Sequence, residues 1–146
     1  LRPGTLPVAI IAGFGLAAEL SVAEVDSRRT ACLKIREQLV AGLAPLQPRY
    51  HGDDAASLPH VVAVSYPGVD ADDVIEQLAG VVAVSTGSAC TSVCATSSHV
   101  LSAMNVPQPE LDGAVRISWS HRTDASQLAE RLPQSVERLS RATARQ

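Results

Sequence analysis

Short β-branched runs separated by longer helical patterns place the strongest constraint on the fold of this 146-residue chain. The run at residues 60–66 is rich in valine and is closed by Pro67 and Gly68, which is typical of a strand that ends in a turn. Further strands are expected at 81–84 and 114–119. Helices are expected over residues 8–24, 26–43, 70–78, 99–104 and 124–142. This order predicts an α/β layer with helices packed on a short sheet.

The helical patterns also indicate where each helix begins and which side it buries. The helix over 26–43 is expected to start at a capping Asp26 or Ser27 and to face the core through one apolar stripe. The stripe recurs every four residues, as Ala31, Ile35, Leu39 and Leu43. Residues 49–58 are expected to form a polar loop, and Pro133 is expected to kink or split the final helix.

The composition excludes several classes of protein. Hydrophobic residues make up 46% and charged residues 18%, which is too apolar for a disordered chain. The net charge of −3, with scattered arginines, argues against direct nucleic-acid binding. Because apolar runs stay short of the roughly 18 residues of a membrane span, no membrane association is expected. Three cysteines without a secretory pattern favour free thiols in a reducing, cytoplasmic environment.

Cys90 lies at the centre of a run of small residues that follows a predicted strand. Small neighbours leave a thiol accessible, although no charged residue beside it would stabilise the thiolate. On these chemical grounds alone, a single cysteine in a loop is more often an unreactive bystander than a nucleophile. A zinc site formed with Cys94 and His99 is disfavoured, because the spacing is irregular and a fourth ligand is missing nearby.

Three segments together resemble the group I cysteine desulfurases of the NifS/IscS type. The segment at 85–92 reads Ser-Thr-Gly-Ser-Ala-Cys-Thr-Ser, which is similar to the active-site loop of that family. Residues 2–7, Arg-Pro-Gly-Thr-Leu-Pro, resemble its Arg-x-Gly-Thr segment, and residues 115–118, Val-Arg-Ile-Ser, resemble its arginine-bearing strand. The chain departs from the usual family pattern at residues 95–97 and 120–123.

The resemblance implies a role for three residues. Cys90 would attack the sulfur of L-cysteine, become a persulfide and pass the sulfur to an acceptor protein, leaving L-alanine. Arg116 would bind the substrate carboxylate, a task suited to a planar, bidentate donor. Thr5 would bind the phosphate of pyridoxal phosphate in the partner's site of a homodimer. Acceptors of such enzymes include iron–sulfur cluster assembly scaffolds, tRNA-thiolation relays and DNA phosphorothioation systems.

The resemblance also implies which part of the enzyme this chain contains. Residues 1–25 would be the end of the cofactor-binding large domain of a fold-type I, aminotransferase-like enzyme, and residues 26–146 its C-terminal small domain. Pyridoxal-phosphate chemistry needs a Schiff-base lysine. Lys34 is the only lysine and has the pattern of a solvated helix residue. The chain is therefore expected to be inactive by itself.

The sequence is also compatible with functions other than that of a cysteine desulfurase. A non-enzymatic sulfur carrier or interaction module would keep the cysteine loop without the cofactor, and a selenocysteine-directed lyase is a third, weaker alternative. Cys32 and Trp119 are expected in the core, with Trp119 alternatively at an interface. His121 either lines the mouth of the site or has no role there. The remaining histidines, His51 and His60, show no expected partner.

Overall fold

The computed structural model describes residues 4–53, 55–66, 68–86 and 98–143. In chain order, the first half contains α1 (Val8–Ala23), α2 (Val25–Leu43), the 3-10 turn η1 (Ala44–Leu46), β1 (Arg49–His51) and β2 (Val61–Ser65). The second half contains α3 (Ala71–Leu78), β3 (Ala83–Thr86), α4 (His99–Ala103), α5 (Gln108–Asp112), β4 (Val115–Ser118) and α6 (Ala125–Thr143). The predicted α/β architecture is confirmed.

The four strands form one antiparallel sheet in the order β1-β2-β4-β3. Successive side chains of a strand point to opposite faces. In β4, Val115 and Ile117 are buried while Arg116 is exposed, so the arginine lies on the face opposite the core. This alternation divides the sheet into an apolar face and a more polar, open face.

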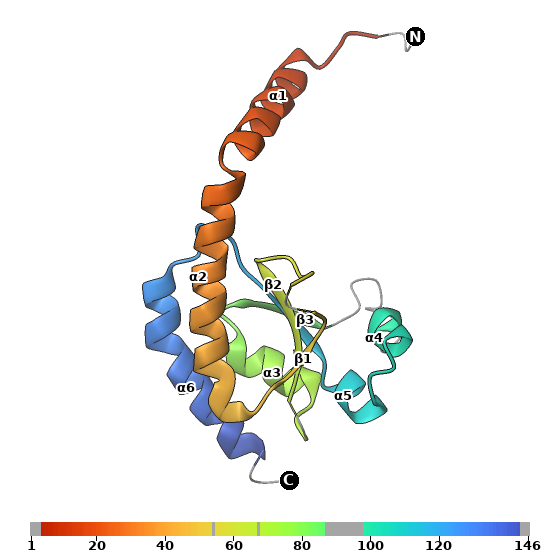
Figure 1. The fold of residues 1–146 in the computed structure, drawn as a ribbon, viewed down its shortest axis with the longest axis vertical. Helices are drawn as coiled ribbons and strands as arrows, with labels where there is room; N and C mark the ends of the chain where they lie inside the picture. Colours follow the sequence, from red (N-terminus) through yellow and green to blue (C-terminus); the bar gives the residue numbers. More distant parts are fainter. Residues whose placement is uncertain (1–3, 54, 67, 87–97, 144–146) are drawn as a thin grey trace.

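Helices α2, α3 and α6 cover the apolar face of the sheet (Figure 1). The stripe predicted on α2 is confirmed at Ile35, Leu39 and Leu43, all of which are buried in the core. Helix α6 contributes a matching stripe of Leu128, Leu132, Val136 and Leu139. A separate small cluster joins α4 and α5 beside the sheet through Leu101, Leu111 and Ala114.

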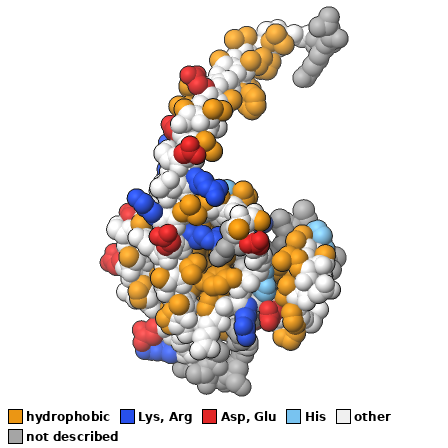
Figure 2. Space-filling view, viewed as in Figure 1, with side chains coloured by type: hydrophobic (Ala, Val, Ile, Leu, Met, Phe, Trp, Pro, Cys, Tyr) orange, Lys and Arg blue, Asp and Glu red, His pale blue; other side chains and the backbone are white. Residues whose placement is uncertain are grey.

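Helix α1 projects away from this body, and apolar side chains are exposed along it (Figures 1 and 2). It has no buried residue among those described, and Phe14 is 76% exposed. Among the described residues, no single helix is long and apolar enough to cross a membrane. Only α1 taken together with Val25–Leu46, which bends from it by 67°, meets that test of length and composition.

Several predicted boundaries were wrong for local reasons. Helix α2 begins at Val25 with Glu24 as its cap, rather than at Asp26 or Ser27. Strand β3 spans Ala83–Thr86 instead of 81–84, because the N–H groups of Val81 and Val82 both bond back to Leu78 and extend the end of α3. The predicted start of α3 is confirmed, since the Asp70 carboxylate accepts a 3.0 Å hydrogen bond from the backbone N–H of Asp72.

Two elements were not predicted, and the split considered at Pro133 is absent. The segment assigned to a polar loop begins with β1, a three-residue edge strand that pairs with β2. Helix α5 follows Pro107 and is held by a 2.7 Å side-chain hydrogen bond from Gln108 to Asp112. Helix α6 continues through Pro133 without being split.

Candidate functional site

Arg116 stands in a row of side chains that crosses the open face of the sheet. Its Cα partners are Ala63 on β2 and Ser85 on β3, and Ala63 is in turn the partner of His51 on β1. Side chains paired directly across antiparallel strands lie on the same face. Among the described residues, the Arg116 guanidinium makes no hydrogen bond or ion pair.

A hollow of about 180 Å³ opens beside Arg116, where the connection between β1 and β2 passes the edge of the sheet. It is lined by Arg36, Tyr50, His51, Gly52, Ser57, Leu58, Val61, Val62, Ala63 and Arg116. Arg36 reaches it from α2 and donates a 3.1 Å hydrogen bond to the backbone oxygen of Val61. The sequence did not predict this site, because it joins residues from three distant segments of the chain.

His51 is held in place by β2. Its Nε2 lies 2.8 Å from the Oγ of Ser65, a residue that is fully buried. Burial lowers the pKa of His51, and the nearby charge of Glu110 offsets part of this effect. The expectation that His51 has no partner is therefore wrong, whereas the imidazole of His60 makes no hydrogen bond or ion pair within the described segments.

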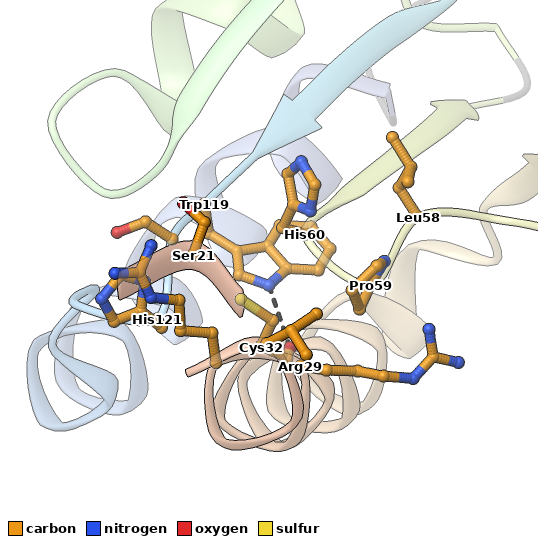
Figure 3. Close-up of a pocket in the computed structure, with 11 residues that line it drawn as sticks. Ser21, Arg29, Cys32, Leu58, Pro59, His60, Trp119 and His121 are labelled. Carbon is orange, nitrogen blue, oxygen red and sulfur yellow. Dashed lines mark hydrogen bonds between the residues drawn. The ribbon is translucent and has the colours of Figure 1, made fainter. Parts of the chain in front are cut away.

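A second hollow, of about 460 Å³, lies between the α1–α2 bend and the ends of β2 and β4 (Figure 3). Trp119 forms part of its floor and donates a 3.0 Å hydrogen bond from Nε1 to the backbone oxygen of Cys32. Both residues are buried, which confirms their predicted core positions, and burial raises the pKa of the Cys32 thiol. His60 and His121 line this second hollow and do not line that of Arg116.

Cys90 and Cys94 lie outside the described residues. The described part of the chain stops at Thr86, whose Cα partner is Val115, the residue before Arg116. It resumes at Ser98, which caps α4. The role predicted for Cys90 and the disfavoured zinc set both stay predictions. Within the described ranges, no three His, Cys, Asp or Glu side chains are grouped so as to hold a metal.

Thr5 and Lys34, the two other residues considered for cofactor binding, lie apart from Arg116. Thr5 is exposed in the segment before α1, at the far end of the projecting helix (Figure 1). Lys34 is exposed on α2. Neither residue lines either of the hollows described above.

Residues 1–130 match the family described as aminotransferase class-V, and the chain belongs to that family. Among its members, this chain is a homologue of the NifS/IscS-type cysteine desulfurases. It is 33% identical to the cysteine desulfurase IscS of Methanosarcina thermophila over 94% of this chain and 35% of the relative. It is 32% identical to the cysteine desulfurase NifS of Azotobacter vinelandii over 87% of this chain and 32% of the relative.

Solved structures show the same relationship. A NifS-like protein matches with a TM-score of 0.77 and 31% identity, over 96% of this chain and 35% of its own. DndA from Streptomyces lividans matches with a TM-score of 0.60 and 33% identity, over 82% of this chain and 34% of its own. The chain therefore spans about a third of the length of the relatives it matches.

Class-V aminotransferases use pyridoxal phosphate, so the described residues can be tested against that cofactor. A cofactor site needs a lysine facing an enclosed cavity together with donors for the phosphate. Here the single lysine, Lys34, is exposed on α2, and Thr5 is exposed on an extended segment. The residues that the structure describes therefore do not fit pyridoxal phosphate by themselves.

Proposed function

We propose that this chain is the sulfur-transferring C-terminal part of a cysteine desulfurase, which converts L-cysteine to L-alanine and passes the sulfur to an acceptor protein. The observation that carries the proposal is the pairing of Arg116 with Ser85, because Cys90 follows Ser85 by five residues. Five residues span at most about 18 Å when fully extended. This limit on the distance between Cys90 and Ser85 is compatible with attack by the Cys90 thiol on a ligand bound by Arg116.

The proposed chemistry divides between these two residues. Arg116 binds the carboxylate of L-cysteine through parallel N–H donors. The Cys90 thiolate attacks the substrate sulfur, so an S–S bond forms and the bond between that sulfur and its carbon breaks. The carbon keeps the electron pair and takes up a proton, giving alanine. The two sulfurs are together oxidised by two electrons, and the carbon is reduced by two.

The remaining parts of the proposal concern the whole enzyme. Residues 1–25 would belong to the large domain and 26–146 to the small domain, and the exposure of apolar side chains all along α1 supports this division. In a homodimer, Thr5 would bind the cofactor phosphate in the partner's site. The Schiff-base lysine would come from a segment other than residues 1–146. A cytoplasmic location completes the proposal.

The test uses the longer protein that contains this segment, supplied with pyridoxal phosphate and L-cysteine. Release of alanine and of sulfide is measured for the unmodified protein and for Cys90→Ser, with Cys94→Ser as the matched control in the same segment. We expect turnover to be lost in Cys90→Ser and retained in Cys94→Ser. Turnover that persists in Cys90→Ser would contradict the proposal.

A non-enzymatic sulfur carrier is the second candidate, and the exposed position of Lys34 favours it. A carrier has no use for a carboxylate-binding arginine, so retention of Arg116 on the open face supports the enzyme instead. The two are separated by offering the 146-residue chain a persulfide made by another desulfurase. A carrier would gain the mass of one sulfur atom at Cys90, while its longer form would release no alanine.

A further inference from the structure

The second hollow, at the bend between α1 and α2, has the size of a site for a small molecule. Its volume of about 460 Å³ falls within the range of roughly 300 to 1,000 Å³ that is usual for drug-sized ligands. Ser21 of α1, Val25 of α2 and Trp119 at the end of β4 all line it. A ligand in this hollow would therefore contact the projecting helix and the body of the fold at once.

The floor of the hollow and part of its wall are apolar. Trp119 and Cys32 lie at the floor and are buried (Figure 3). Burial raises the pKa of the Cys32 thiol, so the thiol stays neutral and acts as a small apolar group. Val25 and Leu58 line the wall and are 57% and 60% exposed. Because removing such surface from water is favourable, the hollow suits a ligand with an apolar body.

Basic side chains surround this apolar floor. Arg28 and Arg29 line the hollow from α2, His60 lines it from the residue before β2, and His121 from the connection after β4. Figure 3 shows Arg29 and His121 on opposite sides of the hollow. The Arg28 guanidinium forms a 2.8 Å salt bridge with Glu24. Within the described residues, the side chains of Arg29, His60 and His121 make no hydrogen bond or ion pair.

The acidic residues near these segments in the sequence have other positions or partners. The Asp53 carboxylate accepts a 2.9 Å hydrogen bond from the backbone N–H of Ala55. The Asp124 carboxylate accepts hydrogen bonds from the backbone N–H and the hydroxyl of Ser126. Asp26, in the first turn of α2, does not line the hollow. Among the described residues, no acidic side chain lines the hollow, so its lining is positively charged.

An apolar floor with a positively charged lining suits an amphipathic anion. Arginine binds a carboxylate through two parallel N–H donors, and a histidine ring adds a further N–H donor. An inorganic anion would leave the apolar wall in water, and an uncharged apolar molecule would leave the arginine without a partner. A small organic acid with an apolar body satisfies both parts of the lining.

We propose that the second hollow binds a small amphipathic carboxylate, an organic acid with an aromatic or branched aliphatic body. Arg29 binds the carboxylate, and the body packs against Leu58, Val25 and the floor at Trp119. The inference is independent of the proposed function, because it assigns no role to the residues on which that function depends.

The experiment uses the fluorescence of Trp119 in the 146-residue chain. Trp119 is the only tryptophan, so its emission reports on the floor of the hollow. Phenylbutyrate is the probe, phenylbutanol has the same body without the charge, and acetate has the charge without the body. We expect a saturable change in emission with phenylbutyrate, which should bind at least about fivefold more tightly than phenylbutanol and more than about tenfold more tightly than acetate. Far-UV circular dichroism at each concentration monitors the fold.

Two substitutions, each with a matched control, test the assigned contacts. Arg29→Gln should weaken phenylbutyrate binding by about fivefold, the effect of losing an exposed ion pair. Lys34→Gln removes a charge from an exposed position of α2 that does not line the hollow, and it should leave binding unchanged. Leu58→Ala should weaken binding by up to about tenfold through lost apolar contact. Phe14→Ala removes an exposed apolar side chain from α1 instead, and it should have no effect.

The ring signals of the four histidines in an NMR spectrum locate the bound probe. His60→Gln and His121→Gln assign the signals of these two residues. Phenylbutyrate should shift the signals of His60 and His121, which line the hollow, and should leave those of His51 and His99, which do not line it.

Each outcome has a defined meaning. Weaker binding in both Arg29→Gln and Leu58→Ala, with both controls unchanged, supports the inference. Phenylbutanol that binds as tightly as phenylbutyrate, or unchanged binding in Arg29→Gln, overturns the carboxylate site. Unchanged binding in Leu58→Ala overturns the apolar contact. A loss in Phe14→Ala as large as that in Leu58→Ala, or signals of His60 and His121 that do not respond, places the probe outside the hollow and overturns the inference.

Discussion

Trp119 and Cys32 join the sheet to its covering helix through one hydrogen bond. The indole Nε1 donates to the backbone oxygen of Cys32 over 3.0 Å, across 87 residues of sequence. Trp119 is 8% exposed and Cys32 5% exposed, so the bond is shielded from water. It fixes the end of β4 against α2, directly below the second hollow (Figure 3).

Replacing Trp119 with phenylalanine should lower the free energy of unfolding by about 2 kcal/mol, because the variant loses this hydrogen bond and part of the buried ring. Urea unfolding followed by circular dichroism measures the change. Leu58→Ala is the control, since Leu58 lines the same hollow but is exposed, and surface changes usually stay within about 0.5 kcal/mol. If the free energy of unfolding falls no more in Trp119→Phe than in Leu58→Ala, the hydrogen bond from Trp119 to Cys32 contributes little to stability.

Tyr66 differs from Trp119, because its polar side-chain atom is buried without a hydrogen-bond partner among the described residues. Its side chain is 2% exposed, and its hydroxyl makes no hydrogen bond within the described residues. Burial, together with the nearby Tyr50, raises the pKa of Tyr66. Because Tyr66→Phe removes an unsatisfied hydroxyl, it should leave the free energy of unfolding unchanged or raise it by up to about 1 kcal/mol. Destabilisation in a urea titration would mean that the hydroxyl has a partner after all.

The parts of the fold that the sequence predicts are those carried by local periodicity. The four-residue repeat on α2 is long enough to identify Ile35 and Leu39 as core residues, and both are buried. Alternation along β4 likewise separates Arg116 from Ile117, and the two lie on opposite faces. Such patterns depend only on the geometry of a helix or a strand, which the sequence records directly.

The rest depends on contacts between distant segments. Strand β1 exists because Tyr50 and its neighbours pair with β2, and three residues carry no periodicity of their own. The hollow beside Arg116 needs Arg36 to reach the backbone of Val61, a contact across 25 residues. Ser65 similarly gives His51 a partner across 14 residues. A single sequence shows which side chains are present, but it does not show which of them meet.

Gly113 is required where α5 turns into β4. A Cβ atom at this position would lie 2.5 Å from the backbone oxygen of Val69, which cannot move aside as a flexible side chain can. Gly113→Ala should therefore lower the free energy of unfolding by about 2 kcal/mol, in the range of overpacked positions.

Gly15→Ala is the matched control for Gly113→Ala, and thermal unfolding measures both. Gly15 lies in α1, and a Cβ atom added to it would have no neighbouring atom of the described residues within 4 Å, so alanine meets no obstacle there. Helix propensity favours alanine over glycine by about 1 kcal/mol. The two variants should thus shift the unfolding midpoint in opposite directions. Equal shifts would show that the contact with Val69 relaxes.

His51 should make the stability of the fold depend on pH. Burial lowers the pKa of His51 below its ordinary value, even though the charge of Glu110 raises it in part. In the unfolded chain, a histidine takes up its proton at about pH 6.5. Below that pH the unfolded state binds more protons at this position than the folded state does. The free energy of unfolding should therefore fall as the pH is lowered from about 7.5 to about 5.5.

Urea unfolding at these two pH values compares the unmodified chain with His51→Gln, which keeps a polar side chain opposite Ser65. The unmodified chain should lose more stability on acidification than His51→Gln does, because glutamine has no proton to gain. His99→Gln, at the exposed start of α4, controls for removal of one histidine and should retain the pH dependence of the unmodified chain. If His51→Gln loses as much stability as the unmodified chain, the acid sensitivity arises elsewhere, and the buried bond to Ser65 tolerates the protonated ring.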